Sequence, residues 1–444
     1  MGLGWYHGFS PSGEFGAERN VRTIYSLAIY LLVPLLLLHL AFRGLRNRQY
    51  LSRWSERFAI YRQPTTRGGI VVHAVSVGEV NAAASLIRAL QKKFPERPLT
   101  VTSFTPTGSE RVSAIFGHSV GHCYLPIDLP GAVRRFFDHV DPSLVVIMET
   151  EIWPNLYFEA ARRDIPLMIS NARISDHSIG GYRRLHRLTR AALAQVACIA
   201  AQSELDASRL LEMGANRDQM VVLGNLKYDL NLPDELAEKG LAYRQSWGLQ
   251  RPVFLAGSTH EGDEGPVLDA FKIIREAVPD CLLVLVPRHP ERFERAAQHA
   301  RSRGLNVVLH SANPICSADD QCYVVDTMGE LLQFYAACDV AFVGGSFDRT
   351  GGHNVLEPAA LGKPVLVGPN TFTFEEITSQ LLASGGALRV MDADELARQV
   401  IRLLGDEATC SQMGQAGLAL VKSGQGALKR TLDIAAKLLS SQSG

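Results

Sequence analysis

The sequence predicts an α/β protein made of two doubly wound domains preceded by a membrane helix. Three observations carry this prediction. Short apolar runs alternate with helical patterns between residues 69 and 223, and the same alternation returns between residues 252 and 367. A polar stretch, residues 225–250, separates the two halves as a linker would. One uncharged hydrophobic run, residues 23–42, lies ahead of both.

Buried parallel strands account for the alternating apolar runs. Strands covered by helices on both faces are apolar along their whole length, and helices connect one strand to the next. Two such sheets joined by a linker would place a cleft between their carboxyl ends, where ligands of these folds bind. The expected strands are residues 69–75, 99–104, 143–148, 166–169, 197–201 and 220–223, then 252–256, 281–286, 305–309, 322–325, 340–343 and 364–367.

The resulting chain has four parts. We expect a tail at residues 1–22, an anchor at 23–42, a first domain at 49–229 and a second domain at 230–444. The last helical pattern, from about residue 410 to 440, is amphipathic and should pack on the outside. At 444 residues the chain is long enough for each domain to have its own core.

Charge and cysteine content exclude several classes of protein. The chain has 45 Lys and Arg residues against 45 Asp and Glu residues, so no net field attracts nucleic acid. Its seven cysteines are odd in number and scattered through apolar runs, which favours a reducing compartment over a disulfide framework. None forms a CxxC pair, which argues against a structural zinc site.

The hydrophobic run at residues 23–42 is long enough to cross a hydrocarbon core. Four arginines follow it and two precede it, and this bias favours a cytoplasmic location for the rest of the chain. A buried core helix is the alternative interpretation. The arginines are Arg43, Arg46, Arg48 and Arg53 after the run, and Arg19 and Arg22 before it.

A glycine-rich stretch at residues 341–368 predicts a strand, a loop, a helix and a second strand. Its four loop glycines would let a phosphate approach the backbone amides closely. Asn354 and Glu357 have the spacing of a capping box at the start of the helix. Alternatively, the helix terminus faces a phosphate while Glu357 accepts hydrogen bonds from a ribose. The loop glycines are Gly344, Gly345, Gly351 and Gly352.

Acidic residues follow two expected strands of the first domain. Glu79 opens the helix after the first strand, where it either favours the helix dipole or acts as a base. Glu149 and Glu151 follow another strand and should raise each other's pKa, unless they belong to an exposed loop. Asn171 and Arg173 come after the next strand and could donate hydrogen bonds to these acids, or be ordinary turn residues.

Other polar residues also follow strands. Lys227 lies at the entrance to the linker and is either solvated or a cation for an anionic substrate. In the second domain, Arg288 and His289 form a candidate phosphate clamp or a rigid proline-flanked turn. The backbone groups of residues 328–330, at an expected helix start, could support a base or a sugar. The DxD pattern at 392–394 is interpreted as a helix start rather than a metal site.

Six motifs in this order resemble the 3-deoxy-D-manno-octulosonic acid (Kdo) transferases of Gram-negative lipopolysaccharide assembly. The motifs are HAVSVGEV, METEIWPN, GNLKYD, PRHPERF, MGEL and GGHNVLEPAALGKPVLVGP. The resemblance runs from about Tyr50 onward, and only the tail before the anchor is less typical. It implies a GT-B glycosyltransferase with two Rossmann-like domains facing across a cleft. It also implies the donor CMP-Kdo, a lipid A precursor (lipid IVA) as acceptor, release of CMP, inversion at the anomeric carbon, and no metal or other cofactor.

The same resemblance assigns roles by position. Glu79 matches the general base of the family, while Glu149 and Lys227 match residues that stabilise the transition state. It also implies an enzyme at the inner membrane, with a single-pass anchor and cytoplasmic domains. A nucleotide-sugar epimerase of similar fold and a non-catalytic, membrane-tethered nucleotide-binding protein remain alternatives. The donor-binding positions are Pro287, Arg288, Met328, Gly329, Glu330, Asn354, Val355, Leu356 and Glu357.

Overall fold

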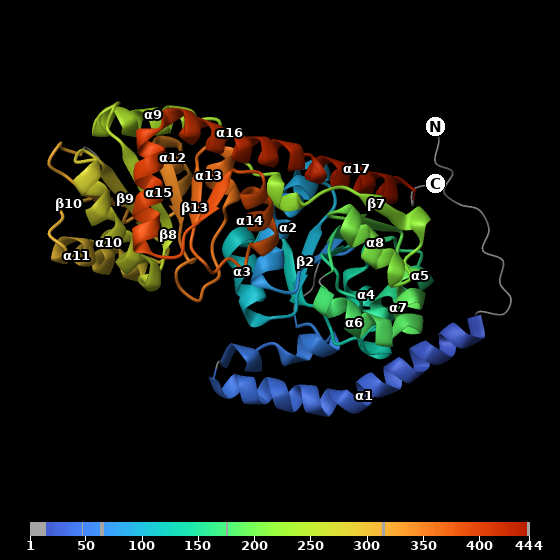
Figure 1. Cartoon of the computed structure of the whole chain (residues 1–444). Helices are drawn as coiled ribbons and strands as arrows, with labels where there is room; N and C mark the ends of the chain where they lie inside the picture. Colours follow the sequence, from blue (N-terminus) through green and yellow to red (C-terminus); the bar gives the residue numbers. More distant parts are fainter. Residues whose placement is uncertain (1–14, 47, 63–65, 175, 313–315, 442–444) are drawn as a thin grey trace. The chain divides into compact units, whose positions relative to one another are not determined.

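A computed structural model describes residues 15–46, 48–62, 66–174, 176–312 and 316–441, so most of the predicted tail lies outside the described residues. The chain divides into two compact units, each built on its own sheet (Figure 1). The first unit comprises residues 1–229 together with 425–444, and the second comprises residues 230–424. The last twenty residues therefore belong with the first unit, whereas the sequence analysis assigned them to the second domain.

The first unit contains a seven-stranded parallel sheet in the order β3-β2-β1-β4-β5-β6-β7. Six of these strands match the predicted apolar runs. The additional strand β3 is short, partly polar and at the sheet edge, so it lacks the apolar run that marks a strand covered on both faces. The strands are β1 Ile70–His73, β2 Leu99–Ser103, β3 Gly121–Tyr124, β4 Leu144–Met148, β5 Leu167–Ala172, β6 Cys198–Ala201 and β7 Met220–Val222.

Helices connect these strands and bury apolar side chains against both faces of the sheet. One core lies between the sheet and helices α4, α5, α7 and α8, and the other beneath α2, α3 and α17. The α-helices are α1 Phe15–Arg46, α2 Val77–Lys93, α3 Pro106–Phe116, α4 Pro130–Val140, α5 Pro154–Arg162, α6 Asp176–Arg184, α7 His186–Leu193, α8 Glu204–Glu212 and α17 Ala427–Ser440. The short 3-10 helices are η1 Arg48–Leu51, η2 Trp54–Phe58, η3 Arg217–Gln219 and η4 Leu226–Tyr228.

The second unit repeats the design with the strand order β10-β11-β9-β8-β12-β13-β14, again all parallel. Its one strand that the sequence analysis missed, β14, is also a short edge strand. The strands are β8 Val253–Thr259, β9 Leu282–Pro287, β10 Val307–Leu309, β11 Cys322–Val324, β12 Val340–Val343, β13 Val365–Val367 and β14 Ala387–Arg389.

Helices also cover both faces of the second sheet. Asp392 accepts a hydrogen bond from the backbone N–H of Glu395 at 2.8 Å and begins α15, so the prediction that the DxD pattern starts a helix is confirmed. The helices are α9 Leu236–Trp247, α10 Glu261–Ala277, η5 Pro290–Arg292, α11 Phe293–Ser302, α12 Leu331–Ala337, α13 Leu356–Ala360, α14 Glu375–Ala383, α15 Ala393–Gly405 and α16 Glu407–Gly424.

The C-terminal helix α17 is fixed to the first unit at its start and along its length. The carboxylate of Asp229 accepts hydrogen bonds from the backbone N–H groups of Gly426 and Leu428, both at 2.7 Å. Ala427, Ala435 and Leu439 are buried in the core beneath α2. The chain thus returns to the first unit, and α17 covers part of its sheet.

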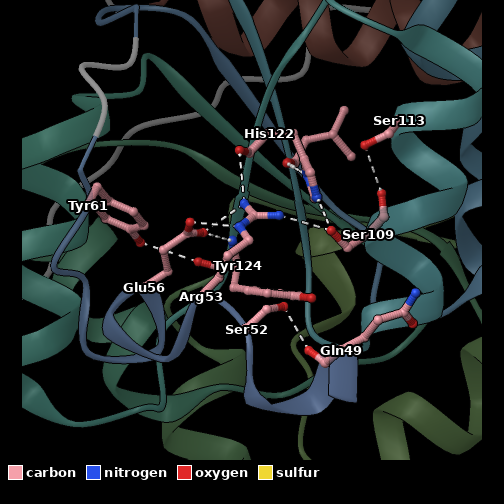
Figure 2. A network of polar contacts seen from close by, with 10 residues as sticks. Gln49, Ser52, Arg53, Glu56, Tyr61, Ser109, Ser113, His122 and Tyr124 are labelled. Carbon is pink, nitrogen blue, oxygen red and sulfur yellow. Dashed lines mark hydrogen bonds and ion pairs between the residues drawn. The ribbon is translucent and has the colours of Figure 1, made fainter. Parts of the chain in front are cut away.

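The segment between α1 and β1 is held by a half-buried polar network (Figure 2). Arg53 donates two hydrogen bonds of 2.7 Å to Glu56 and one of 3.0 Å to Ser109. Glu56 accepts the backbone N–H of Tyr124 at 3.0 Å, and the Arg53 guanidinium lies over the ring of the same tyrosine. This two-point pairing of arginine with carboxylate fixes the segment to strand β3 and helix α3.

Candidate active site

A small cavity opens at the carboxyl ends of three neighbouring strands of the first unit. Glu79 follows β1, Glu149 follows β4, and Arg173 follows β5, and these strands are adjacent in the sheet. Their loops therefore meet at one edge, as the topology of a doubly wound sheet predicts. The cavity has a volume of about 150 Å³ and is lined by Glu79, Glu149, Thr150, Glu151, Arg173, Ile174 and Tyr182.

Glu79 binds the two residues that precede its helix and lines the cavity at the same time. Its two carboxylate oxygens accept the backbone N–H of Val75 at 2.9 Å and the hydroxyl of Ser76 at 3.0 Å. Burial raises the pKa of Glu79, the Val75 hydrogen bond opposes that rise, and the charge of Glu149 adds to it. The position at the helix start and the base role are thus compatible, because a carboxylate with a raised pKa accepts a proton more readily.

Glu149 lies in a backbone conformation that non-glycine residues rarely adopt, with φ at 55°. Strand β4 ends just before it, so Glu149 and Glu151 both lie in the loop that follows the strand. Both still reach the cavity. Arg173 donates from Nε to the Glu149 carboxylate at 3.1 Å, as the sequence analysis expected of a compensating donor. Strained backbone of this kind persists where the surroundings hold it in place.

Glu151 has the most perturbed carboxyl group in the cavity. Burial, followed by the charges of Glu79 and Glu149, raises its pKa to about 7. The prediction that these clustered acids raise one another's pKa is therefore confirmed for Glu151, with burial as the larger cause. At neutral pH this group exchanges its proton readily, while its neighbour Glu149 is paired with Arg173.

Two expected cleft residues have other surroundings. Asn171 is buried, and its Oδ1 accepts the backbone N–H of Leu226 at 2.9 Å, so it holds η4 rather than the acids of the cavity. Lys227 lies in η4, where its backbone N–H is capped by Asn225 at 3.0 Å. Among the described residues, Lys227 is not part of the cavity lining. Leu226 packs in the same core as α2, which carries Glu79.

The glycine loop of the second unit differs from the expected phosphate cradle. Gly345 donates its N–H to the carboxylate of Asp263 at 2.7 Å, and Phe347 donates to the same carboxylate at 2.9 Å. The N–H groups of Gly344 and Gly352 bind backbone carbonyls within the unit. Three of the four glycines therefore use their amides for internal contacts, which corrects the prediction that these amides are available to a phosphate.

These glycines are needed for close packing instead. A Cβ atom on Gly344 would lie 2.5 Å from the carbonyl oxygen of Ser258, closer than real side chains approach a backbone. Gly345 has a φ of 72°, and a Cβ there would meet the His353 ring at 2.9 Å. The loop after β12 thus packs tightly on the end of β8.

Asn354, Glu357 and Arg288 are close together in the second unit. Asn354 donates from Nδ2 to Glu357 at 3.1 Å and accepts the backbone N–H of Leu356 at 3.1 Å. Helix α13 begins at Leu356 with Val355 as its cap, one residue later than predicted, and the capping box is replaced by this side-chain pair. Burial raises the pKa of Glu357, while Asn354 and the charge of Arg288 oppose the rise.

Residues 328–330 follow β11. In the sheet, β11 lies next to β9, and Pro287 is the last residue of β9. Gly329 has a φ of 87°, and Met328 is 54% exposed. Glu330 accepts hydrogen bonds from Thr327 and Gln333. The predicted donor-binding segments thus lie at or after the carboxyl ends of β9, β11 and β12, of which β9 and β11 are adjacent and β12 is separated from β9 by β8.

A histidine cluster was missed as a unit by the sequence analysis. The Nε2 atoms of His260 and His353 are 2.8 Å apart with nearly parallel rings, and the His289 ring contacts His260. Burial lowers the pKa of His353 to about 4, so its ring is neutral at pH 7. The sequence feature that could have indicated this cluster is that each of the three histidines follows a different strand. Thr150 and Tyr182, which line the first cavity, had no comparable signal.

Comparisons with known proteins agree over nearly the whole chain. The profile of the 3-deoxy-D-manno-octulosonic-acid transferase (kdotransferase) family matches residues 52–230, and that of glycosyl transferases group 1 matches residues 266–419. The 3-deoxy-D-manno-octulosonic acid transferase of Haemophilus influenzae is 40% identical over 93% of this chain and 97% of its own length. The protein of the same name from Bordetella pertussis is 37% identical over 93% of this chain and 98% of its own length.

A solved structure gives the fold. UDP-GlcNAc 2-epimerase from Neisseria meningitidis, bound to UDP-GlcNAc, has a TM-score of 0.53 and covers 83% of this chain and 100% of that chain. At 14% identity this likeness shows the GT-B fold alone, so it does not support the epimerase alternative. Family profile and relatives together establish that the chain belongs to the Kdo transferases, the GT-B glycosyltransferases of lipopolysaccharide biosynthesis.

Proposed function

We propose that this transferase moves Kdo from CMP-Kdo to a lipid A precursor, lipid IVA, and releases CMP with inversion at the anomeric carbon. The observation that carries the proposal is the Glu79 carboxylate on the wall of the first-unit cavity, with its pKa raised by burial. An acceptor hydroxyl is a poor nucleophile until a base removes its proton. Glu79 is that base, and the attack opposite the leaving phosphate inverts the anomeric carbon.

The other acids and cations divide the remaining work. Glu149, held by Arg173, and Lys227 stabilise the charges of the transition state in the first unit. In the second unit, Arg288 balances the charge of the departing phosphate. In this proposal the cations of the chain stabilise the negative charge that a divalent metal would otherwise stabilise. No metal or other cofactor therefore takes part.

The donor is bound by the second unit. Asn354 and Glu357 form a bonded pair beside Arg288, which suits recognition of a sugar hydroxyl next to a phosphate. The backbone of residues 287 and 328–330, at the ends of β9 and β11, completes this site. The donor-binding set is Pro287, Arg288, Met328, Gly329, Glu330, Asn354, Val355, Leu356 and Glu357.

The enzyme acts at the inner membrane with both units on the cytoplasmic side. The support for this proposal is helix α1, whose window Asn20–Leu45 is apolar and long enough to cross a membrane, with a mean hydropathy of 2.2. The arginines that follow it favour cytoplasmic units. An acceptor dissolved in the inner leaflet is then met by an enzyme confined to the same surface.

The test is transfer in a defined mixture. The full chain in detergent or vesicles is incubated with CMP-Kdo and lipid IVA, in parallel with and without a chelator, and CMP release and lipid mass are measured. We expect one CMP for each Kdo added, a heavier lipid and unchanged rates in chelator. CMP release without a heavier lipid would contradict the acceptor assignment, and loss of transfer in chelator would contradict the metal-free mechanism.

A further inference from the structure

Helix α1 is docked on the first unit along one side. The buried and half-buried residues recur every three or four positions, which places them on one face of the helix. Figure 1 shows α1 running beside the helices of its own unit, and it packs against α5 and α7. The docked residues are Arg22, Tyr25, Ser26, Ile29, Val33, Leu36, Leu40 and Gly44.

Polar contacts fix the first part of this docked face. Asn155, at the start of α5, accepts hydrogen bonds from Arg22 Nε at 2.9 Å and from the Ser26 hydroxyl at 3.2 Å. Tyr25 donates to the carboxylate of Asp128 at 3.0 Å. Asn155 and Asp128 are buried, so these partners would lose hydrogen bonds if α1 moved away. The helix is therefore held in one rotation and one register.

Apolar contacts and the following segment fix the rest of the helix. Ile29, Val33 and Leu36 pack, together with Phe58, against a buried cluster formed by Ile127, Leu129 and Ala132. Near the end, Gly44 lies so close to the Leu51 side chain that a Cβ would come within 2.4 Å of it. The chain around Leu51 leads directly into the Arg53–Glu56 network (Figure 2).

The opposite side of α1 is apolar and exposed. Four large aliphatic residues spaced seven apart form a line along it, because seven residues are nearly two helical turns. Their exposed fractions are 66%, 78%, 66% and 80% for Ile24, Leu31, Leu38 and Leu45. The line runs the length of the window that composition marks as a possible span. Exposed apolar surface of this extent requires a hydrophobic partner.

A spanning orientation conflicts with the docking. If α1 crossed the bilayer, the elements packed along it would enter the hydrocarbon with it. Those elements carry exposed charged residues, namely Arg162 on α5 and Arg187 and Arg190 on α7. Charged side chains are costly at that depth, whereas at the surface they meet anionic head groups.

We propose that α1 lies along the surface of one phospholipid leaflet instead of spanning the bilayer, with the line from Ile24 to Leu45 among the acyl chains. This inference rests on the membrane association proposed above and replaces the spanning anchor that the sequence predicts. The docked helix holds the first unit at a fixed angle to the leaflet. The cavity containing Glu79 therefore has a set orientation toward a lipid acceptor.

Depth measurements test the proposal. Single cysteines replace Ile24, Leu31, Leu38 and Leu45 in turn, in a Cys410→Ser background that retains the six buried cysteines. Each carries a nitroxide, and the full chain is bound to vesicles of phosphatidylethanolamine and phosphatidylglycerol. Accessibility to oxygen and to a water-soluble nickel chelate then reports the depth of each label. Glu96→Cys, on the exposed surface of the unit, is the aqueous control.

We expect all four labels at one similar, shallow depth below the phosphates. A profile with Leu31 and Leu38 near the bilayer centre and the two end positions near opposite surfaces would show a spanning helix and overturn the inference alone. Four labels as water-accessible as the Glu96→Cys control would instead show that α1 does not enter the membrane. That outcome would overturn both the inference and the proposed membrane association. The proposed transfer of Kdo is tested separately, by the assay with an acceptor dispersed in detergent.

Discussion

Three carboxylates and one arginine share the cavity of the first unit. Glu79 is bonded to Val75 and Ser76, Glu149 is paired with Arg173, and Glu151 has a pKa of about 7. The sequence placed these residues together because each follows a strand and neighbouring parallel strands end at one edge. It did not give the pKa of Glu151, because that depends mainly on burial by residues distant in the chain.

Replacing Glu79 by glutamine should remove the base while preserving the shape of the side chain. We expect kcat to fall by about 10² to 10⁴-fold, the usual contribution of general base catalysis. CMP should bind as before, because its proposed site is in the second unit. Kinetics and CMP titration by calorimetry measure the two effects. The matched control Glu96→Gln changes an exposed acid and should retain full activity. If Glu79→Gln also retained its activity, Glu79 would not be the general base.

Glu151 should make stability depend on pH. Its folded pKa of about 7 exceeds its ordinary value of 4.5, so the folded state favours the protonated form. The contribution to the free energy of unfolding is full below pH 4.5 and is lost as the pH rises toward 7, by about 3 kcal/mol at most. Thermal melts between pH 4.5 and 8 should fall less steeply for Glu151→Gln than for the wild type. Identical slopes would show that Glu151 titrates normally.

At the scale of elements, two helix starts and one loop are held by carboxylates from remote segments. Asp128 caps α5 by accepting the backbone N–H groups of Asn155 at 2.8 Å and Leu156 at 2.9 Å. Asp263 likewise binds the loop after β12, and Asp229 binds the start of α17. The sequence predicted the helices themselves from their periodicity. It did not predict these caps, because each partner is far away in the chain.

Asp128→Ala should destabilise the first unit. It leaves two buried N–H groups at the start of α5 and the hydroxyl of Tyr25 without their acceptor, which costs roughly 2–3 kcal/mol. Urea unfolding, followed by hydrogen exchange in β4 and β5, measures the loss. The control Asp392→Ala removes an exposed local cap of α15 and should cost about 1 kcal/mol in the second unit only. Equal losses for both variants would contradict the buried-cap argument.

At the scale of the whole molecule, chain order and unit membership differ. Residues 425–444 follow the second unit in sequence but complete the first unit, where α17 buries Ala427, Ala435 and Leu439. The amphipathic pattern showed that a helix would pack on a surface. It could not show which surface, because either sheet offers an apolar face.

Leu439→Ala should therefore weaken the first unit although the residue lies at the C-terminal end of the chain. The side chain is 3% exposed, and truncating a buried leucine costs about 2–3 kcal/mol. Hydrogen exchange should accelerate in β1 and β4 and remain unchanged in β8 and β9. Leu403→Ala, at a buried position of α15, should give the reverse pattern. Faster exchange in β8 after Leu439→Ala would contradict the assignment of α17 to the first unit.

The sequence by itself determined twelve of the fourteen strands in the described part of the chain, the position of the apolar helix α1 and the set of residues at the strand ends. These features depend on apolar runs and turn residues within short windows, so local sequence encodes them. The tertiary structure alone decided that Asp263 binds the loop amides, that α17 joins the first unit and which face of α1 is docked. Each of these features depends on contacts between residues that are far apart in the chain. Local sequence does not distinguish between the possible partners, whereas packing and hydrogen bonding in the folded state do.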